Sequence, residues 1–357
     1  MKRFFAVLLS VSMFGIWSCT HDRSFDETGA QGQPFDKCPV DFSVAGFDLQ
    51  QAASKTTTIN LTEGTTVRVL VYQRAATAPD PGRDRYVTEK TYRIHSDGSF
   101  LPCETDAAGV VTVPTAGPLE LVGGEYDFYA YAPALEMTAR PTLSVGHGTD
   151  FIATAPVSQR VAGRRTYVDL LFTHKAAQLH FTVRRKADAN TVYSVAMQEQ
   201  GVKVEKLAAS PASYTLGGEI AVSGSAYSGV SEIPGSRFTP INEYTTAVLD
   251  TVLAREPNAL GGDDLRLTFH VRINDALYKT YTTTLSAMEL RPGHRYRFDV
   301  LVKDGGAVLT LFELLPWTRN VLTDLEVGGD PSNGIVLGEW TEAGWSTGLG
   351  DEGVVPF

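Results

Sequence analysis

Histidine side chains are the first residues in this sequence that could do chemistry, because imidazole binds metal ions and moves protons near neutral pH. His174 and His180 flank the stretch KAAQL, in a region with the composition of a strand. Six residues at about 3.3 Å each separate the two side chains by roughly 20 Å, so they cannot share one metal ion. Four further histidines are scattered among predicted strands and turns: His95, His147, His270 and His294. The sequence therefore predicts no metal site.

Aspartates beside glycines are the second candidates, as paired carboxylates that exchange a proton. Asp263 and Asp264 lie in GGDDL, and Asp304 lies in KDGG. Asp beside Gly is typical of tight turns, which explains these residues without catalysis. The sequence contains no nucleophile elbow, phosphate-binding loop or dinucleotide fingerprint. We therefore expect a protein that is not an enzyme and has no cofactor.

A cysteine at the end of an apolar run offers a different chemistry, the covalent attachment of lipid. Two basic residues precede an apolar segment, residues 4–17, that is too short to anchor a chain across a bilayer and is typical of a secretory signal. The segment is followed by a cysteine in the sequence IWSC, which resembles the lipobox of bacterial lipoproteins. The resemblance implies that residues 1–18 are removed as a signal peptide and that the thiol and amine of Cys19 are acylated.

Lipid on Cys19 predicts a protein that is anchored to the outer membrane of a Gram-negative cell while its body stays in water. Each acyl methylene that enters the bilayer contributes about 0.8 kcal/mol, so two or three chains hold the protein firmly. Residues 19–37 are polar and rich in Gly and Gln, as expected of a tether. Asp22, Asp26 and Glu27 follow the cysteine closely, and acidic residues there resemble the surface-export signal of lipoproteins in some anaerobic gut bacteria. A solvated acidic linker has the same pattern.

Net charge excludes one class of partner. Without residues 1–18 the chain keeps 29 basic and 41 acidic residues, a formal net charge of −12. A basic surface for nucleic acid is therefore excluded.

Cys38 and Cys103 are the other two cysteines, and an exported chain meets an oxidising compartment. Two isolated cysteines cannot establish proximity. A disulfide between them and two free thiols are equally consistent with the sequence.

Short runs of β-branched and aromatic residues recur along the chain, and Gly, Pro, Asn and Asp separate them. No segment of helical length has a sustained apolar stripe with a period of 3.6 residues. The sequence therefore predicts an all-β fold of antiparallel sandwiches. The predicted strands are residues 40–47, 65–73, 90–100, 110–114, 125–133, 166–172, 177–183, 201–207, 264–273, 277–285 and 295–303.

A short internal sequence repeat divides the chain into two β-domains. The segments LVGGEYDF (121–128) and LRPGHRYRF (290–298) share a leucine, a following glycine and an aromatic pair two positions apart. Aromatic residues two apart on a strand point to one face, where they can fill a core. The copies lie about 170 residues apart, as expected of a duplicated domain. We therefore expect β-domains at 38–160 and 161–325 and a Gly-rich tail at 326–357.

Four segments in this order resemble the fimbrillin or Mfa-like family, whose members are lipoprotein precursors of fimbriae in anaerobic Gram-negative bacteria. They are LVGGEYDFYAYAPA (121–134), LLFTHKAAQLHFTV (170–183), LRPGHRYRFDVLVK (290–303) and ELLPWTRN (313–320). The resemblance implies two tandem transthyretin-like β-sandwich domains. It also implies a role in building or anchoring surface fimbriae for cell adhesion, with other fimbrial subunits as partners.

The resemblance further implies assembly by strand exchange. In that family an arginine-specific protease removes the first strand of a stalk subunit, and a strand from the C-terminal end of a neighbour fills the vacated groove. The first predicted strand here is 40–47, yet no arginine occurs between Arg23 and Arg68. The candidate processing residues are Lys55, which has the wrong side chain, Arg68, inside a predicted strand, and Arg74, just past it. This departure favours an anchor or accessory role in which the lipid stays attached.

The tail leaves two interpretations open. Its apolar pieces, GIVLGEW and GVVPF, can serve as a donor strand or pack on their own domain. Trp317, Trp340 and Trp345 can stack on sugar rings. The alternative function is therefore a surface adhesin or glycan-binding lipoprotein that does not polymerise and contacts host or bacterial surface proteins or glycans.

Overall fold

Strands make up nearly all the regular structure of the residues that the structure describes. The computed structural model describes residues 37–44, 61–105, 111–112, 117–222, 227–255, 264–275, 277–285, 288–316, 335–339 and 341–346. Within these ranges the helical structure is a single 3-10 turn, η1 (Gly235–Arg237). Every predicted strand overlaps an observed one, so the prediction of an all-β fold is confirmed.

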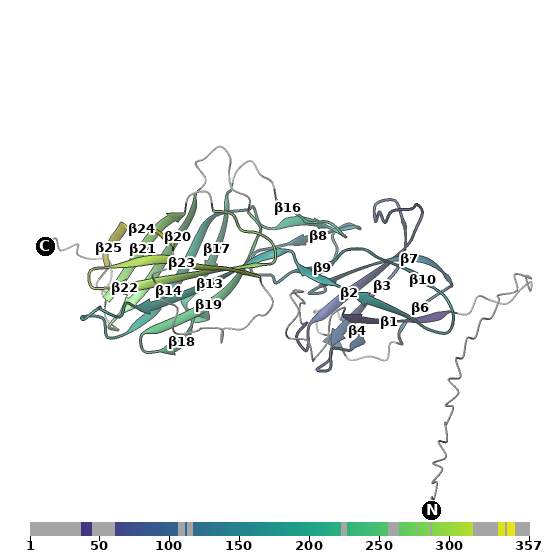
Figure 1. Ribbon diagram of the computed structural model, residues 1–357, viewed down its shortest axis with the longest axis horizontal. Helices are drawn as coiled ribbons and strands as arrows, with labels where there is room; N and C mark the ends of the chain where they lie inside the picture. Colours follow the sequence, from purple (N-terminus) through teal and green to yellow (C-terminus); the bar gives the residue numbers. More distant parts are fainter. Residues whose placement is uncertain are drawn as a thin grey trace, which may run out of the picture. The chain divides into compact units, whose positions relative to one another are not determined.

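Two sheets make up most of the N-terminal half (Figure 1). The β1 sheet has the order β11 (Thr166–Leu170), β1 (Cys38–Val44), β6 (Leu119–Leu121). The β7 sheet has the order β12 (Phe172–His174), β9 (Ile152–Thr154), β7 (Gly124–Ala132), β2 (Thr66–Gln73), β3 (Arg85–Ile94), β4 (Phe100–Thr105), β5 (Val111–Thr112), and β10 (Val157–Val161) also pairs with β7.

Two further sheets make up the C-terminal half. The β22 sheet has the order β18 (Thr239–Asn242), β19 (Thr245–Leu253), β13 (Ala176–Arg185), β22 (His294–Lys303), β23 (Gly306–Pro316), β24 (Ile335–Glu339). The β14 sheet has the order β17 (Gly229–Ile233), β14 (Val195–Leu207), β20 (Leu265–Ile273), β21 (Leu277–Leu285), β25 (Thr341–Ser346).

A small sheet joins strands from both halves. It has the order β16 (Ile220–Ala221), β15 (Ala212–Thr215), β8 (Thr142–Val145). Strands β11 and β12 pair with N-terminal strands, and β13 is the first strand of the β22 sheet. The change between the two sets of sheets falls at Lys175, and the domain boundary expected near residue 160 stays a prediction.

Two strand pairings in the described part of the chain are parallel, where the sequence predicted antiparallel sheets. β1 runs parallel to β11, and β13 runs parallel to β22. Both pairs join strands far apart in the sequence, so no hairpin turn sets their direction. The transthyretin-like strand order stays a prediction.

Each half has an apolar core between its two sheets, because alternate residues of each strand face inward. In the N-terminal core, Phe42 of β1 packs with Val69 of β2 and Phe128 of β7. In the C-terminal core, Phe181 of β13 lies 5.4 Å from Phe269 of β20, measured between ring centroids. The first strand is thus part of a core and not a surface addition.

The two copies of the internal repeat form corresponding turns before β7 and β22, and the aromatic pair of each copy is buried. The hydroxyl of Tyr126 donates to the carbonyl of Val122 at 2.9 Å, and the backbone N–H of Arg291 donates to the hydroxyl of Tyr296 at 2.8 Å. Gly293, in the longer second copy, has a φ of 71°, which glycine adopts at little cost. Each tyrosine therefore fixes the turn that precedes its own strand.

Candidate functional site

The first strand is the candidate functional site, because the sequence resemblance singles it out as the element that can leave the fold. Cys38, Val40, Phe42 and Val44 are buried in the N-terminal core, and the residues between them are more exposed. This alternation places one face of β1 inward along its whole length. The observed strand overlaps the predicted one, 40–47, and residues 45–47 lie outside the described ranges.

β1 is the middle strand of its sheet and has a partner on both edges. Val40 lies opposite Thr166 of β11, and Cys38 lies opposite Leu121 of β6. Without β1, the facing edges of β11 and β6 would have unpaired N–H and C=O groups beside an apolar trough. An extended strand from another chain satisfies both, which is the chemistry of β-augmentation.

Phe42 is the main side chain that β1 contributes to the core. Its ring centroid lies 5.3 Å from that of Tyr92, 5.8 Å from Phe128 and 6.2 Å from Phe100. The contacts with Tyr92 and Phe128 are edge-to-face, a geometry worth about 0.5–1.5 kcal/mol per pair beyond the buried area. A strand that replaces β1 therefore needs a large apolar residue at this position.

Sequence reasoning proposed the strand but missed its partners. The edges that receive it belong to β6 and β11, whose sequences are distant from β1. Period-two alternation in both segments was the only signal, and alternation does not say which strands pair.

Both candidate disulfide cysteines are buried and have free thiols in the structure. The sulfur of Cys38 lies 3.4 Å from the hydroxyl oxygen of Thr166 on β11. Burial is the main cause that raises the pKa of the Cys103 thiol. The thiol of Cys103 is therefore held in its neutral, less reactive form.

Arg68 is buried in the middle of β2, between β3 and β7. Its guanidinium pairs with Glu136 and lies 3.4 Å from Glu89. A protease binds its substrate as an accessible extended segment, and β2 has a strand on both edges. Processing at Arg68 would require β2 to leave the sheet first, and it stays a prediction.

Arg74 follows β2 and is held by a fully buried carboxylate. Its Nε and Nη2 donate to Asp127, the closest contact being 2.6 Å, and Asp127 also accepts the hydroxyl of Ser158 at 2.5 Å. The hydrogen bond with Asp127 is the first cause that raises the pKa of Arg74. Arg74 is thus part of the N-terminal fold, and processing there stays a prediction.

Cys19 and Lys55, the remaining predicted site residues, lie outside the described ranges. Lys55 is the single basic residue between the end of β1 at Val44 and the start of β2 at Thr66. A cut that releases β1 and leaves β2 in place falls within this stretch.

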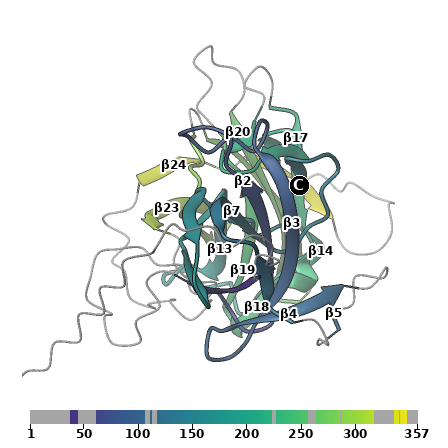
Figure 2. The same cartoon turned by 90° about the vertical axis from the view of Figure 1, so that its right-hand side faces the viewer.

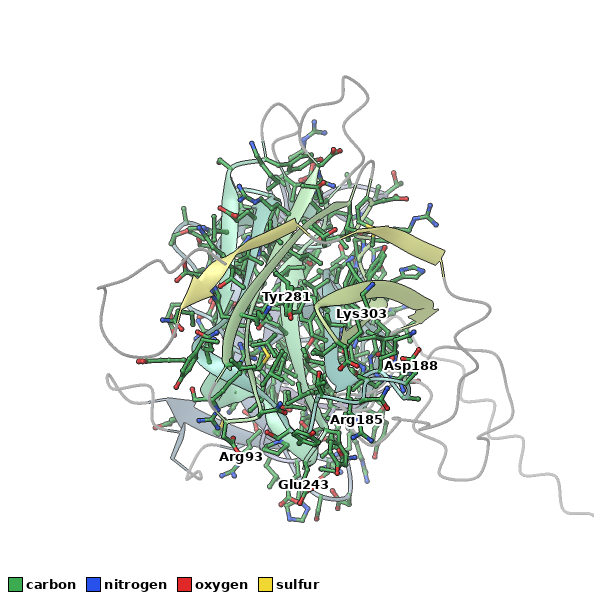
Figure 3. The ribbon with its side chains drawn as sticks, turned by 90° about the vertical axis from the view of Figure 1, so that its left-hand side faces the viewer. Arg93, Arg185, Asp188, Glu243, Tyr281 and Lys303 are labelled. Carbon is green, nitrogen blue, oxygen red and sulfur yellow. The ribbon has the colours of Figure 1, made fainter. Side chains whose placement is uncertain are left out.

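The tail pairs with its own half in the described structure. β24 pairs with β23, and β25 pairs with β21, where Trp345 lies opposite Lys279. Figure 3 shows both tail strands, in yellow, along the C-terminal sheets. GIVLGEW therefore contains a strand, as the sequence indicated, while GVVPF, Trp317 and Trp340 lie outside the described ranges.

The candidate histidines and carboxylates are engaged separately. His174 ends β12 and its Nδ1 lies 2.8 Å from Asp150, while His180 lies on β13. Asp304 accepts the backbone N–H groups of Asn190 and Thr191, both at 2.9 Å, and so joins its turn to a loop that is distant in sequence. In the part of the chain that the structure describes, no group of three or more His, Cys, Asp or Glu residues is arranged to hold a metal ion.

Comparison with solved structures identifies the same fold in three bacterial proteins. A candidate cell adhesion protein from Bacteroides fragilis has a TM-score of 0.58 and 19% identity, over 80% of this chain and 100% of that one. Candidate cell adhesion proteins from Bacteroides ovatus and Bacteroides uniformis have TM-scores of 0.54 and 0.51, identities of 16% and 14%, and cover 81% and 79% of this chain and 100% and 99% of their own. At these identities the likeness shows a shared fold.

Sequence comparison identifies the family. No curated protein matches the sequence. None of the helices in the described ranges has the length and apolar character of a membrane span. The family described as fimbrillin-like matches residues 37–321, most of the chain, and it is a family of structural fimbrial subunits and not of enzymes. The chain therefore belongs to the fimbrillin-like family.

Proposed function

We propose that this protein is a lipid-anchored subunit of cell-surface fimbriae that joins other subunits by addition of β-strands and contributes to adhesion. The observation that carries the proposal is the position of β1, a middle strand with an apolar face and a partner on both edges. Such a strand leaves a complete acceptor site when it is removed, and it closes that site while it remains.

The lipid anchor is proposed from the lipobox at Cys19. The anchor and β1 lie on the same side of any cut between residues 45 and 60, so one cleavage removes both. Lys55 is the basic residue in that stretch, and arginine is absent from it. We therefore expect the mature protein to keep both its lipid and its first strand, as an anchoring or accessory subunit does.

The tail is the proposed donor. β24 and β25 each lie at the edge of a sheet, so their release breaks pairing on one side only. A strand that leaves its own half and enters the trough of a neighbour makes a head-to-tail contact, and repeated head-to-tail contacts build open fibres.

The intact mass and N-terminal sequence of the protein purified from its own cells test this proposal. We expect a chain that begins at acylated Cys19 and copurifies with fimbriae. A chain that begins after Lys55 and has no lipid would refute the anchor role and favour a stalk subunit. A chain with lipid that never copurifies with fimbriae would refute the fimbrial role.

A further inference from the structure

One loop of the N-terminal half, residues 146–151 between β8 and β9, is hydrogen-bonded to the C-terminal half. The backbone N–H of Gly148 donates to the carbonyl of Thr251 on β19 at 2.6 Å. The backbone N–H of His147 donates to the hydroxyl of Ser210, which follows β14, at 2.9 Å. The loop is therefore part of the joint between the two halves.

The imidazole of His147 adds two hydrogen bonds to this joint. Its Nδ1 lies 3.1 Å from the backbone nitrogen of Leu253, and its Nε2 lies 3.1 Å from the carbonyl oxygen of Ala208. A backbone N–H only donates and a carbonyl only accepts, so Nδ1 has to be the unprotonated acceptor and Nε2 has to carry the proton. The two contacts thus define a neutral ring in a single tautomer.

The Leu253 amide depends on this ring because one edge of β19 is open there. β18, which lies beside β19 in Figure 2, pairs with it only between Thr245 and Ala247. In the described part of the chain, the strand paired with Leu253 is β13, on the other edge, through Ala176. His147 therefore supplies the acceptor that a neighbouring strand would supply.

Both hydrogen-bond partners of the ring belong to an apolar core that contains residues of both halves. Ala208 and Leu253 are fully buried, and they form one cluster with Leu143, Val145 and Phe151. Water does not easily replace a lost acceptor in such a place. A change in the number of protons on the ring therefore changes the stability of the joint.

The direction of this change follows from the pKa of the ring. Burial is the first cause that lowers the pKa of His147, and the Ala208 hydrogen bond and the Asp250 carboxylate oppose it. The folded chain therefore takes up this proton at a lower pH than the unfolded chain does. The contribution of the ring to stability is present above a pH of about 6.5 and is lost as the pH falls below that value.

The charged groups on the surrounding elements are already engaged. Asp250 of β19 is paired with Arg237 at 2.7 Å. Residues 208–211 contain no titratable side chain. On the loop itself, Asp150 lies 2.8 Å from the Nδ1 of His174. A proton on the Nδ1 that faces the Leu253 amide thus replaces a hydrogen bond with two N–H groups that point at each other.

We propose that His147 is an acid-sensitive hydrogen-bond bridge between the two halves of this chain. Its neutral ring holds the end of β19 to the loop at neutral pH. Protonation breaks the bond to Leu253 and lets the two halves move relative to each other. The device needs no ligand, and it does not depend on how the subunits assemble.

Hydrogen exchange at the Leu253 amide of the full chain, corrected for intrinsic chemical exchange, tests the proposal. Between about pH 7.5 and 4.5 we expect its protection factor to fall by at least about tenfold, as for the loss of one buried hydrogen bond. In His147→Asn the side-chain oxygen accepts the same N–H and does not titrate, so protection should change by less than about twofold. The matched control is His95→Asn on an exposed turn, which should keep the dependence of the unmodified chain.

Two further measurements follow the ring and the halves directly. The ¹⁵N shifts of the His147 ring in the unmodified chain should identify the Nε2–H tautomer at neutral pH. Spin labels on Leu101→Cys and Leu277→Cys, one exposed position in each half, should give a broader distance distribution in acid. The broadening should disappear in His147→Asn.

Four results would overturn the inference. They are an Nδ1–H tautomer at neutral pH, protection of Leu253 that does not change with pH, an equal fall of protection in His147→Asn, and a distance distribution that is the same at both pH values. The tautomer and the exchange of the unmodified chain decide the question even if His147→Asn does not fold.

Discussion

Replacing Phe42 with alanine measures how much β1 contributes to the N-terminal core. Phe42 is 8% exposed, and its ring contacts three aromatic neighbours. Removal of a buried Phe side chain costs about 3–5 kcal/mol, from lost transfer energy and the cavity left behind. The edge-to-face contacts with Tyr92 and Phe128 add to this loss. We expect Phe42→Ala to lower the free energy of unfolding by about 4 kcal/mol.

Urea unfolding followed by tyrosine fluorescence and circular dichroism is the assay. With an m-value of about 2–3 kcal/mol/M, the expected loss lowers the midpoint of the N-terminal transition by roughly 1.5 M. Tyr167→Ala is the control, because Tyr167 lies on the neighbouring strand β11 and is 67% exposed. The control should change stability by less than about 0.5 kcal/mol. Equal shifts in the two variants would refute the conclusion that β1 is a core strand.

Three further predictions concern pH, an ion pair and the anchor. Burial, followed by the charges of Arg297 and Arg295, lowers the pKa of His180 to about 4. As pH falls from about 6.5 to 4, the His180 imidazole is therefore protonated in the unfolded chain before it is protonated in the folded chain. Up to about 3 kcal/mol of folding stability is lost in that pH range. His180→Gln should flatten this part of a pH–stability curve relative to His95→Gln on an exposed turn, and an unchanged slope would contradict the assignment. Asp127→Asn should cost about 3 kcal/mol in thermal or urea unfolding, because it leaves Arg74 without its buried partner, and a loss below 1 kcal/mol would argue against this pair. Cys19→Ala should move the protein from the membrane fraction to the soluble fraction or leave an unprocessed precursor, and unchanged membrane retention on an immunoblot would rule out the lipid.

The strands were predictable from sequence because burial on one face imposes period two, and the burial pattern of β20 follows it closely. The internal repeat also predicted related local structure, since Tyr126 and Tyr296 fix equivalent turns. Pairing was not predictable. The parallel partner of β1 is β11, a strand far along the chain, and period-two alternation is identical for every candidate partner.

The division expected at residues 160 and 161 stays a prediction. The sequence there is polar and basic, and β10 continues to Val161 and pairs with β7. Composition reports solvent exposure, and an edge strand is exposed on one side just as a linker is.

Under the proposed function, retention of the lipid and retention of β1 are one event, and this links the anchor to the acceptor. Both lie before Lys55, so a cut there removes the anchor and opens the trough between β11 and β6 together. A head-to-tail fibre needs one donor and one acceptor on each internal subunit, whereas a subunit at its end needs only one of them. A chain that keeps β1 has its trough filled, so it either ends the fibre or receives a neighbour elsewhere. The absence of arginine between Arg23 and Arg68 therefore supports our proposal that this subunit keeps β1 together with its lipid and occupies the membrane end of a fibre.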